Sequence, residues 1–154
     1  MSKVTAPLEN MKSFTEKLKM ENNNVLNIPV KPGKWSTREI IGHLYYWDSY
    51  ISESIVPFLN QGRTLPPFPN HNVFNRAAVA ALEGRSAGRI IDSFIEGRIR
   101  LIEQLEAAGH AAEVKLQGAE ETLTVHKIIN IFSSHDSHHQ KQIEEFLETY
   151  SDRG

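Results

Sequence analysis

Cysteine is absent from all 154 residues of the chain, which excludes disulfide bonds, thiolate metal ligands and a cysteine nucleophile. The chain also lacks a large excess of charge, because it contains 17 lysine and arginine residues and 19 aspartate and glutamate residues, which gives a net charge of −2. Proteins that bind nucleic acid through its phosphates normally carry a basic excess, so a nucleic-acid partner is not expected. The sequence shows no signal-peptide core and no apolar run of membrane-spanning length. We therefore expect a cytoplasmic protein with no membrane partner.

The composition is that of a folded globular protein. Hydrophobic residues make up 40% of the chain and charged residues 23%, which are ordinary values for globular domains. A chain of this length can bury about 70% of its unfolded surface, so it needs no disulfide to fold. We expect one domain that spans residues 1–154.

Four long stretches carry apolar residues at spacings of three and four, the pattern of amphipathic helices. Proline, glycine and asparagine separate these stretches, and strand patterns are few, although residues 114–118 fit either a short strand or a loop. The sequence therefore predicts an all-α, up-and-down-type four-helix bundle. The helices are expected over about residues 7–22, 37–60, 87–108 and 125–150, with a short additional piece over about 72–82.

The second helix has the clearest predicted start. Ser36 stands three residues before Glu39, the spacing of a capping box in which each side chain bonds the other residue's free amide. Trp35 and Ile40 flank this cap at the spacing of a hydrophobic staple. Pro57 comes late enough to kink or fray the end of the helix without abolishing it.

Three of the seven histidines lie close together in the last predicted helix. With 100° per residue, His139 points at the centre of the bundle and His135 lies just beside it, whereas His138 turns toward the flank and His126 faces outward. His43, in the second helix, shares a flank of that helix's apolar stripe. Two helices thus carry histidine where the core is expected.

Burying three imidazoles costs several kcal/mol unless their ring nitrogens find partners. A divalent cation would satisfy all three, because an i, i+4 pair on one helix spans an edge of a coordination polyhedron and a facing helix supplies the third ligand. The alternative is a buried hydrogen-bond network in which Gln142, Asp136 or backbone carbonyls bind the rings. The sequence leaves both open.

Two windows of the chain, WSTREIIGHL (35–44) and HDSHHQKQI (135–143), carry a family resemblance. They resemble the DinB-like superfamily of small four-helix-bundle metalloproteins, which includes bacillithiol transferase-like proteins and, more distantly, mycothiol-dependent isomerases. The resemblance implies a metal site made of His43, His135 and His139. Sites rich in imidazole accept zinc, nickel, iron and manganese, so the sequence does not specify which of these divalent ions is bound. It also implies a homodimer. Gln142 matches the family's H-x-x-x-H-x-x-Q-I pattern and could hold a ligand ring or contact a metal-bound group.

Three reactions or roles fit such a site. The favoured one is a metal-dependent transferase that joins a low-molecular-weight thiol to an electrophilic small molecule; the thiol must arrive on a cosubstrate because the chain has no cysteine. A hydrolase that activates water is the first alternative, but its candidate bases, Asp48 and Glu53, are poorly aimed relative to His43 on the helical wheel. A non-enzymatic metal-binding stress-response bundle is the second alternative.

The remaining polar and aromatic candidates have plainer interpretations. Asp136 is expected at the exposed edge of the bundle, and His71 in a solvated loop. Trp47 could line a pocket, but aromatic residues at helical spacing are usually core. Arg63 and Arg76 flank the proline-rich connection and could hold an anionic cosubstrate.

Overall fold

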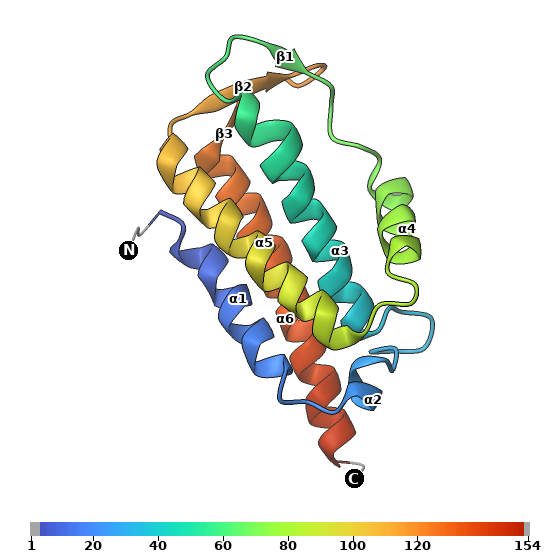
Figure 1. Cartoon of the computed structure of the whole chain (residues 1–154). Coiled ribbons are helices and arrows are strands. Elements are labelled where there is room, and N and C mark those ends of the chain that lie inside the picture. The colour runs from blue at the N-terminus through green and yellow to red at the C-terminus, as the bar shows by residue number, and fades with distance from the viewer. Residues whose placement is uncertain (1–3, 153–154) are drawn as a thin grey trace.

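The computed structural model describes residues 4–152 and shows four long helices packed side by side, with a small sheet at one end (Figure 1). The predicted four-helix bundle is confirmed. Two shorter helices, α2 and α4, lie outside it. The helices are α1 (Ala6–Leu18), α2 (Asn23–Leu26), α3 (Thr37–Tyr50), α4 (His71–Ala81), α5 (Ala87–Ala108) and α6 (Val125–Asp152).

The start of α3 is fixed by its capping box, as predicted. The Ser36 hydroxyl accepts the amide of Glu39 at 3.2 Å, and the Glu39 carboxylate accepts the amide of Ser36 at 3.0 Å. The α-helix ends at Tyr50, earlier than the predicted 60, and continues as a π-helix over Ile51–Ile55 and a 3₁₀ turn over Val56–Phe58. Pro57 lies in that last turn, where its missing amide costs little.

The first predicted helix is also interrupted. α1 ends at Leu18, and the side chain of Asn22 then accepts the amide of Asn24 and caps the short α2. Asparagine bonds its own local backbone readily, so this run begins a new turn and does not extend α1.

Three short strands form a sheet at the end of the bundle where α3 and α5 finish (Figure 1). β1 (Thr64–Leu65) pairs in parallel with β2 (Glu113–Leu116), and β2 pairs antiparallel with β3 (Leu123–Thr124). Of the two interpretations of residues 114–118, the strand holds for 114–116. The sheet as a whole was not predicted, because two-residue strands carry no readable alternation.

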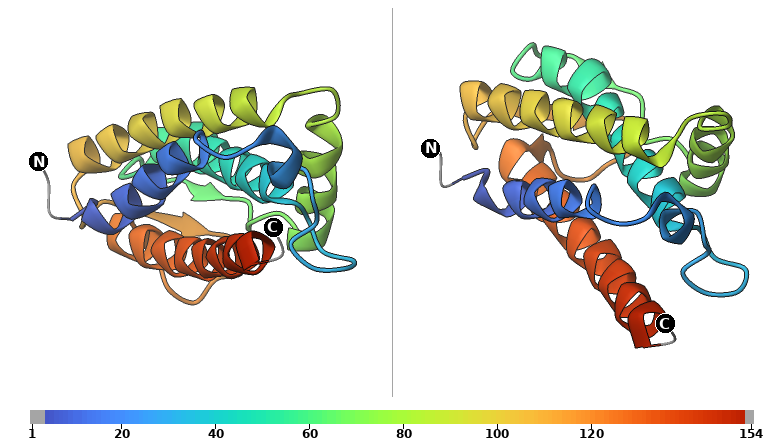
Figure 2. Two further views of the ribbon diagram at one scale, coloured as in Figure 1. Left: turned by 90° about the horizontal axis from the view of Figure 1, so that it is seen from below. Right: turned by 60° about the horizontal axis from the view of Figure 1, so that its bottom comes forward.

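A long crossover returns the chain from β1 through α4 to the opposite end of the bundle (Figures 1 and 2). As a result α3 and α5 run in the same direction, so the four-helix bundle is confirmed but its helices do not alternate in the predicted up-and-down order. α4 lies on the outside against α3. Gly42 permits this contact, since a Cβ at that position would overlap the side chain of Leu82, which follows α4.

The bundle interior is apolar along its length. α1 packs against α5 and α6, and α3 packs against α5. Buried residues such as Ile40, Phe94, Ile128 and Ile143 come from three of these helices and carry the predicted inner-face spacing. Within residues 4–152, none of the helices has the length and apolar character needed to cross a membrane.

Candidate metal centre

His43, His135 and His139 meet between α3 and α6. Their ring centroids lie 5.4 Å (43–135), 4.9 Å (43–139) and 4.6 Å (135–139) apart. Each ring offers one nitrogen, and these nitrogens lie within 4.8 Å of one another. The three residues that sequence patterns and family resemblance singled out are therefore within reach of a common ion.

His43 is held rigidly in the interior. Its side chain is 1% exposed, more deeply buried than a position on the flank of the apolar stripe predicts. Its Nδ1 lies 2.6 Å from the carbonyl oxygen of Ile40, one turn earlier in α3, and the Trp35 ring packs 4.7 Å from its own. A carbonyl can only accept, so Nδ1 carries the proton and Nε2 carries a free lone pair.

His135 and His139 stand one turn apart on α6 and are half-buried. The Nδ1 of His139 donates to Oε1 of Gln142 at 2.9 Å, which again leaves Nε2 as the lone-pair nitrogen. That Nε2 lies 3.2 Å from the Nε2 of His135. Gln142 thus fixes a candidate ligand ring, the kind of contact that orients metal-bound histidines in proteins.

The donor set fits a divalent ion. Two of the three rings have their Nδ1 atoms bonded outward to Ile40 and Gln142, so their Nε2 lone pairs face the shared space. Lone pairs that face one another repel unless a proton or a cation lies between them. Neutral imidazoles with one nitrogen held by a carbonyl oxygen are the usual form of histidine ligands.

The electrostatics of the cluster keep these rings neutral. Burial, followed by the neighbouring rings of His139 and His135, lowers the pKa of His43 to about 3. Burial and the rings of His139, His138 and His71 lower the pKa of His135 to about 4. The pKa of His139 is also lowered by burial, against the opposing bond to Gln142. At neutral pH the rings are therefore in the unprotonated state that binds metal.

Three further histidines, at positions 71, 126 and 138, are exposed and lie outside this cluster. His138 and His126 are exposed, as the helical wheel predicts. His71 is exposed too, but it begins α4 where a loop was expected, and its ring lies edge-on to Trp47 at 5.3 Å. Together with His135 it lines a cavity of about 310 Å³ between α3, α4 and α6. Trp47, 8% exposed, lies in the core and also forms part of this cavity wall.

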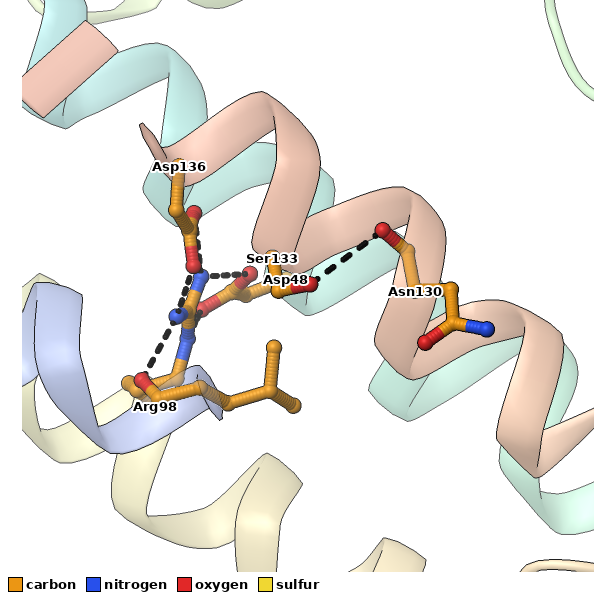
Figure 3. Close-up of polar contacts among 6 residues, drawn as sticks. Asp48, Arg98, Asn130, Ser133 and Asp136 are labelled. Carbon is orange, nitrogen blue, oxygen red and sulfur yellow. Dashed lines mark hydrogen bonds and ion pairs between the residues drawn. The ribbon is translucent and has the colours of Figure 1, made fainter. Parts of the chain in front are cut away.

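A second polar cluster lies in the same interior and corrects one prediction. Asp136 is 4% exposed, so it does not lie at a solvated edge. Figure 3 shows the guanidinium of Arg98, from α5, held by the carboxylates of Asp48 and Asp136. Arg98 Nε donates to Asp48 at 2.7 Å, Nη1 to Asp136 at 2.7 Å, and Nη1 also to the carbonyl of Leu8 at 3.0 Å.

Sequence reasoning missed Arg98, which is fully buried. The sequence does indicate the burial of Arg98, because this residue falls between Phe94 and Leu101 on the apolar face of α5. Burial alone would lower its pKa, but Asp48 and Asp136 outweigh burial and raise it, so Arg98 stays charged. Burial, opposed by Arg98, raises the pKa of Asp48 to about 6.

The remaining candidates lie apart from the histidines or are already engaged. Glu53, on the π-helix, is exposed. Arg63 packs over the Phe58 ring at 5.1 Å, and Arg76 is exposed on α4. Of the two candidate bases, Asp48 is bonded to Arg98 and Glu53 points to solvent.

Comparisons with known proteins agree with this fold. The family model of the DinB superfamily matches residues 9–143. Among solved structures, one similar to this chain is YfiT from Bacillus subtilis, which is described as a probable metal-dependent hydrolase with an unusual four-helix bundle topology. The two align with a TM-score of 0.74 at 14% sequence identity, and the alignment covers 98% of this chain and 90% of YfiT. A mycothiol-dependent maleylpyruvate isomerase aligns with a TM-score of 0.71 at 13% identity, covering 91% of this chain but 59% of the isomerase. A search of curated protein sequences finds no significant match.

Proposed function

Because the chain belongs to the DinB superfamily, we propose that it binds a divalent transition metal through His43, His135 and His139 and transfers a low-molecular-weight thiol to an electrophilic small molecule. The observation that carries the proposal is the convergence of three neutral ring nitrogens, two of them oriented by Ile40 and Gln142. Zinc, nickel and iron suit imidazole donors and manganese binds them more weakly, and the ion is left open among these four.

The three rings define what such a centre can do. They bring no negative charge, so a divalent ion keeps its full double charge toward a substrate. An ion bound there would act as a Lewis acid that favours the thiolate form of a thiol or lowers the pKa of water. The chain itself has no cysteine, so the sulfur of a transferase must come from a cosubstrate.

The acidic residues around the site favour thiol transfer over hydrolysis. A hydrolase needs a general base within reach of the attacking water. Asp48 and Asp136 are bonded to Arg98, and Glu53 is exposed on the π-helix. A thiol is a much stronger acid than water, so it ionises on a metal ion more readily without such a base. The isomerase neighbour is named for its dependence on a thiol, mycothiol, whereas the description of YfiT supports hydrolysis, which remains the second candidate.

A paired assay of metal and thiol dependence tests the proposal. Protein stripped with a chelator and reloaded with zinc is mixed with chlorodinitrobenzene, with and without cysteine or glutathione. We expect thiol and electrophile to disappear in equal amounts, and His43→Ala and His135→Ala to reduce the rate about 100-fold. The exposed His138→Ala serves as the matched control and should keep full activity.

Two other results of this assay would each favour one of the alternative functions. Electrophile loss at the same rate without thiol would replace the transferase with the hydrolase. No turnover, together with a large fall in melting temperature when the metal is removed, would favour the non-enzymatic bundle, in which the ion is structural. The homodimer, the cytoplasmic location and the single domain remain predictions, and light scattering tests the first of them.

A further inference from the structure

The cavity of about 310 Å³ beside His135 has a mostly apolar wall. Three aromatic rings, from Trp47, Phe68 and Phe132, and two isoleucines form most of it. Its polar groups are His71, Asn75 and His135, and none of the described residues that line it is an aspartate, glutamate, lysine or arginine. The cavity therefore offers apolar contact next to a candidate metal ligand.

The aromatic wall is preformed. The Trp47 ring stacks on Phe74 of α4 at 4.0 Å, and its Nε1 donates to Oδ1 of Asn75 at 2.8 Å. The Phe68 ring, from the connection before α4, lies edge-on to Tyr50 at 5.8 Å. Side chains fixed in this way lose little conformational freedom when a ligand binds, which favours affinity.

The size and charge of the cavity limit its ligand. Pockets for small molecules usually measure about 300–1,000 Å³, so this one lies at the lower end of that range and suits a single ring. An anionic group placed against the aromatic wall would lose its hydration and find no basic side chain among the residues that line the cavity, and a cationic group would be repelled by the divalent ion proposed at His135. The polar groups His71 and Asn75 can instead bond one neutral polar substituent.

We infer that this cavity holds the electrophile, and that the electrophile is uncharged and carries one aromatic ring. The inference rests on the proposed function, because His135 joins the cavity to the candidate metal centre. It adds the class of substrate, which that function leaves open, and assigns the wall of Trp47, Phe68 and Phe132 to substrate selection.

A binding measurement on metal-free protein tests the cavity separately from the metal. The probes are 4-nitroanisole, which is neutral, and 4-nitrobenzoate, which is an anion of similar size; both quench tryptophan fluorescence, and Trp47 lines the cavity. We expect saturable quenching by the neutral probe and about tenfold weaker binding of the anion.

Two isoleucines provide a matched pair of variants. Ile131 lies on the cavity wall and is 50% exposed, whereas Ile99, on α5, is 41% exposed and does not line the cavity. Ile131→Arg should weaken binding of the neutral probe about tenfold, and Ile99→Arg should leave it unchanged. If Ile131→Arg fails to fold, as judged by circular dichroism, Phe68→Ala takes its place with the same expected loss.

The results separate this inference from the proposed function. Equal binding of both probes, or unchanged binding in the cavity variant, would overturn the assignment of the cavity even if zinc binds at His43, His135 and His139. Selective binding of the neutral probe to a protein that takes up no zinc would overturn the metal centre, and the cavity would then be a site for neutral aromatic molecules and not the electrophile site of a metal-dependent transferase.

Discussion

The bundle interior contains two polar clusters with opposite chemistry. In one, the Arg98 guanidinium donates to Asp48, Asp136 and the Leu8 carbonyl, so buried donors meet buried acceptors. In the other, lone pairs of His43 and His139 face the space shared with a third ring. The first cluster is therefore complete as it stands, whereas the second presents ring lone pairs that suit a cation.

The two clusters are also neighbours, because both draw residues from α3 and α6. Asp136 directly follows His135 in α6, and Asp48 lies in α3, five residues after His43. By binding both carboxylates, Arg98 links the two helices that supply the candidate ligands and, through Leu8, reaches α1. The ion pairs fix the helices, and the fixed helices bring the rings together.

The largest expected effect is the loss of Arg98. Arg98→Met leaves two buried carboxylates without a partner, and removal of one member of a buried ion pair costs about 3–5 kcal/mol of unfolding free energy. His43→Leu in metal-free protein removes a neutral ring and should change the unfolding free energy by less than about 1 kcal/mol. Urea denaturation of both variants measures the difference.

A triple variant provides the control for this comparison. Replacing Asp48 and Asp136 by asparagine in the Arg98→Met background removes the unpaired charges and should recover part of the lost stability. Equal losses in Arg98→Met and His43→Leu would contradict the contrast between a completed cluster and one whose ring lone pairs suit a cation.

Lowering the pH is expected to have an intermediate effect on the free energy of unfolding. The pKa of His43 is about 3 in the folded chain and about 6.5 when unfolded, so the unfolded state binds more protons between these values. Stability is therefore complete above pH 6.5 and falls as pH decreases through this window, by about 2 kcal/mol from His43 between pH 7 and pH 5. Asp48, whose pKa is raised to about 6, acts in the opposite direction.

Comparing wild type with His43→Leu isolates the histidine, because Asp48 is present in both. Denaturation of the metal-free proteins at pH 7 and pH 5 should show a decrease in stability that is about 2 kcal/mol larger in wild type. Parallel pH profiles would mean that the His43 ring is accessible to protons in the folded chain.

The smallest effect is expected at Gln142. Gln142→Leu removes the acceptor that holds Nδ1 of His139 while leaving the three rings in place. Loss of such a supporting contact typically weakens metal binding about tenfold. Competition with a chromophoric zinc chelator measures the change, and Gln140→Leu, a neighbouring half-buried glutamine, is the matched control. Equal affinity in both variants would remove Gln142 from the site.

Local patterns predicted much of this molecule. The capping box of Ser36 and Glu39 and the inward positions of His135 and His139 depend on spacings of three or four residues within one helix, which a single sequence displays directly. The starts of α5 and α6 fall at the predicted residues 87 and 125, where the hydroxyls of Ser86 and Thr124 accept the amides of Arg89 and Lys127, three residues later.

Contacts between distant segments could not be read in this way. The sequence predicts an exposed edge for Asp136 because this residue lies about 100° from His135 on the helical wheel. That flank is covered by Arg98 from α5 and packs near α1, so α6 is buried over a wider arc than one apolar stripe implies. The crossover through α4 depends likewise on pairings between distant segments, which spacing along the chain does not reveal.

The central claim is that three histidine nitrogens share one metal ion, and X-ray absorption by zinc-loaded protein tests it most directly. The account predicts three imidazole nitrogens at about 2.0–2.1 Å from zinc, and two in the His43→Ala variant. A first shell made only of oxygen atoms, or one that is the same in wild type and His43→Ala, would contradict it.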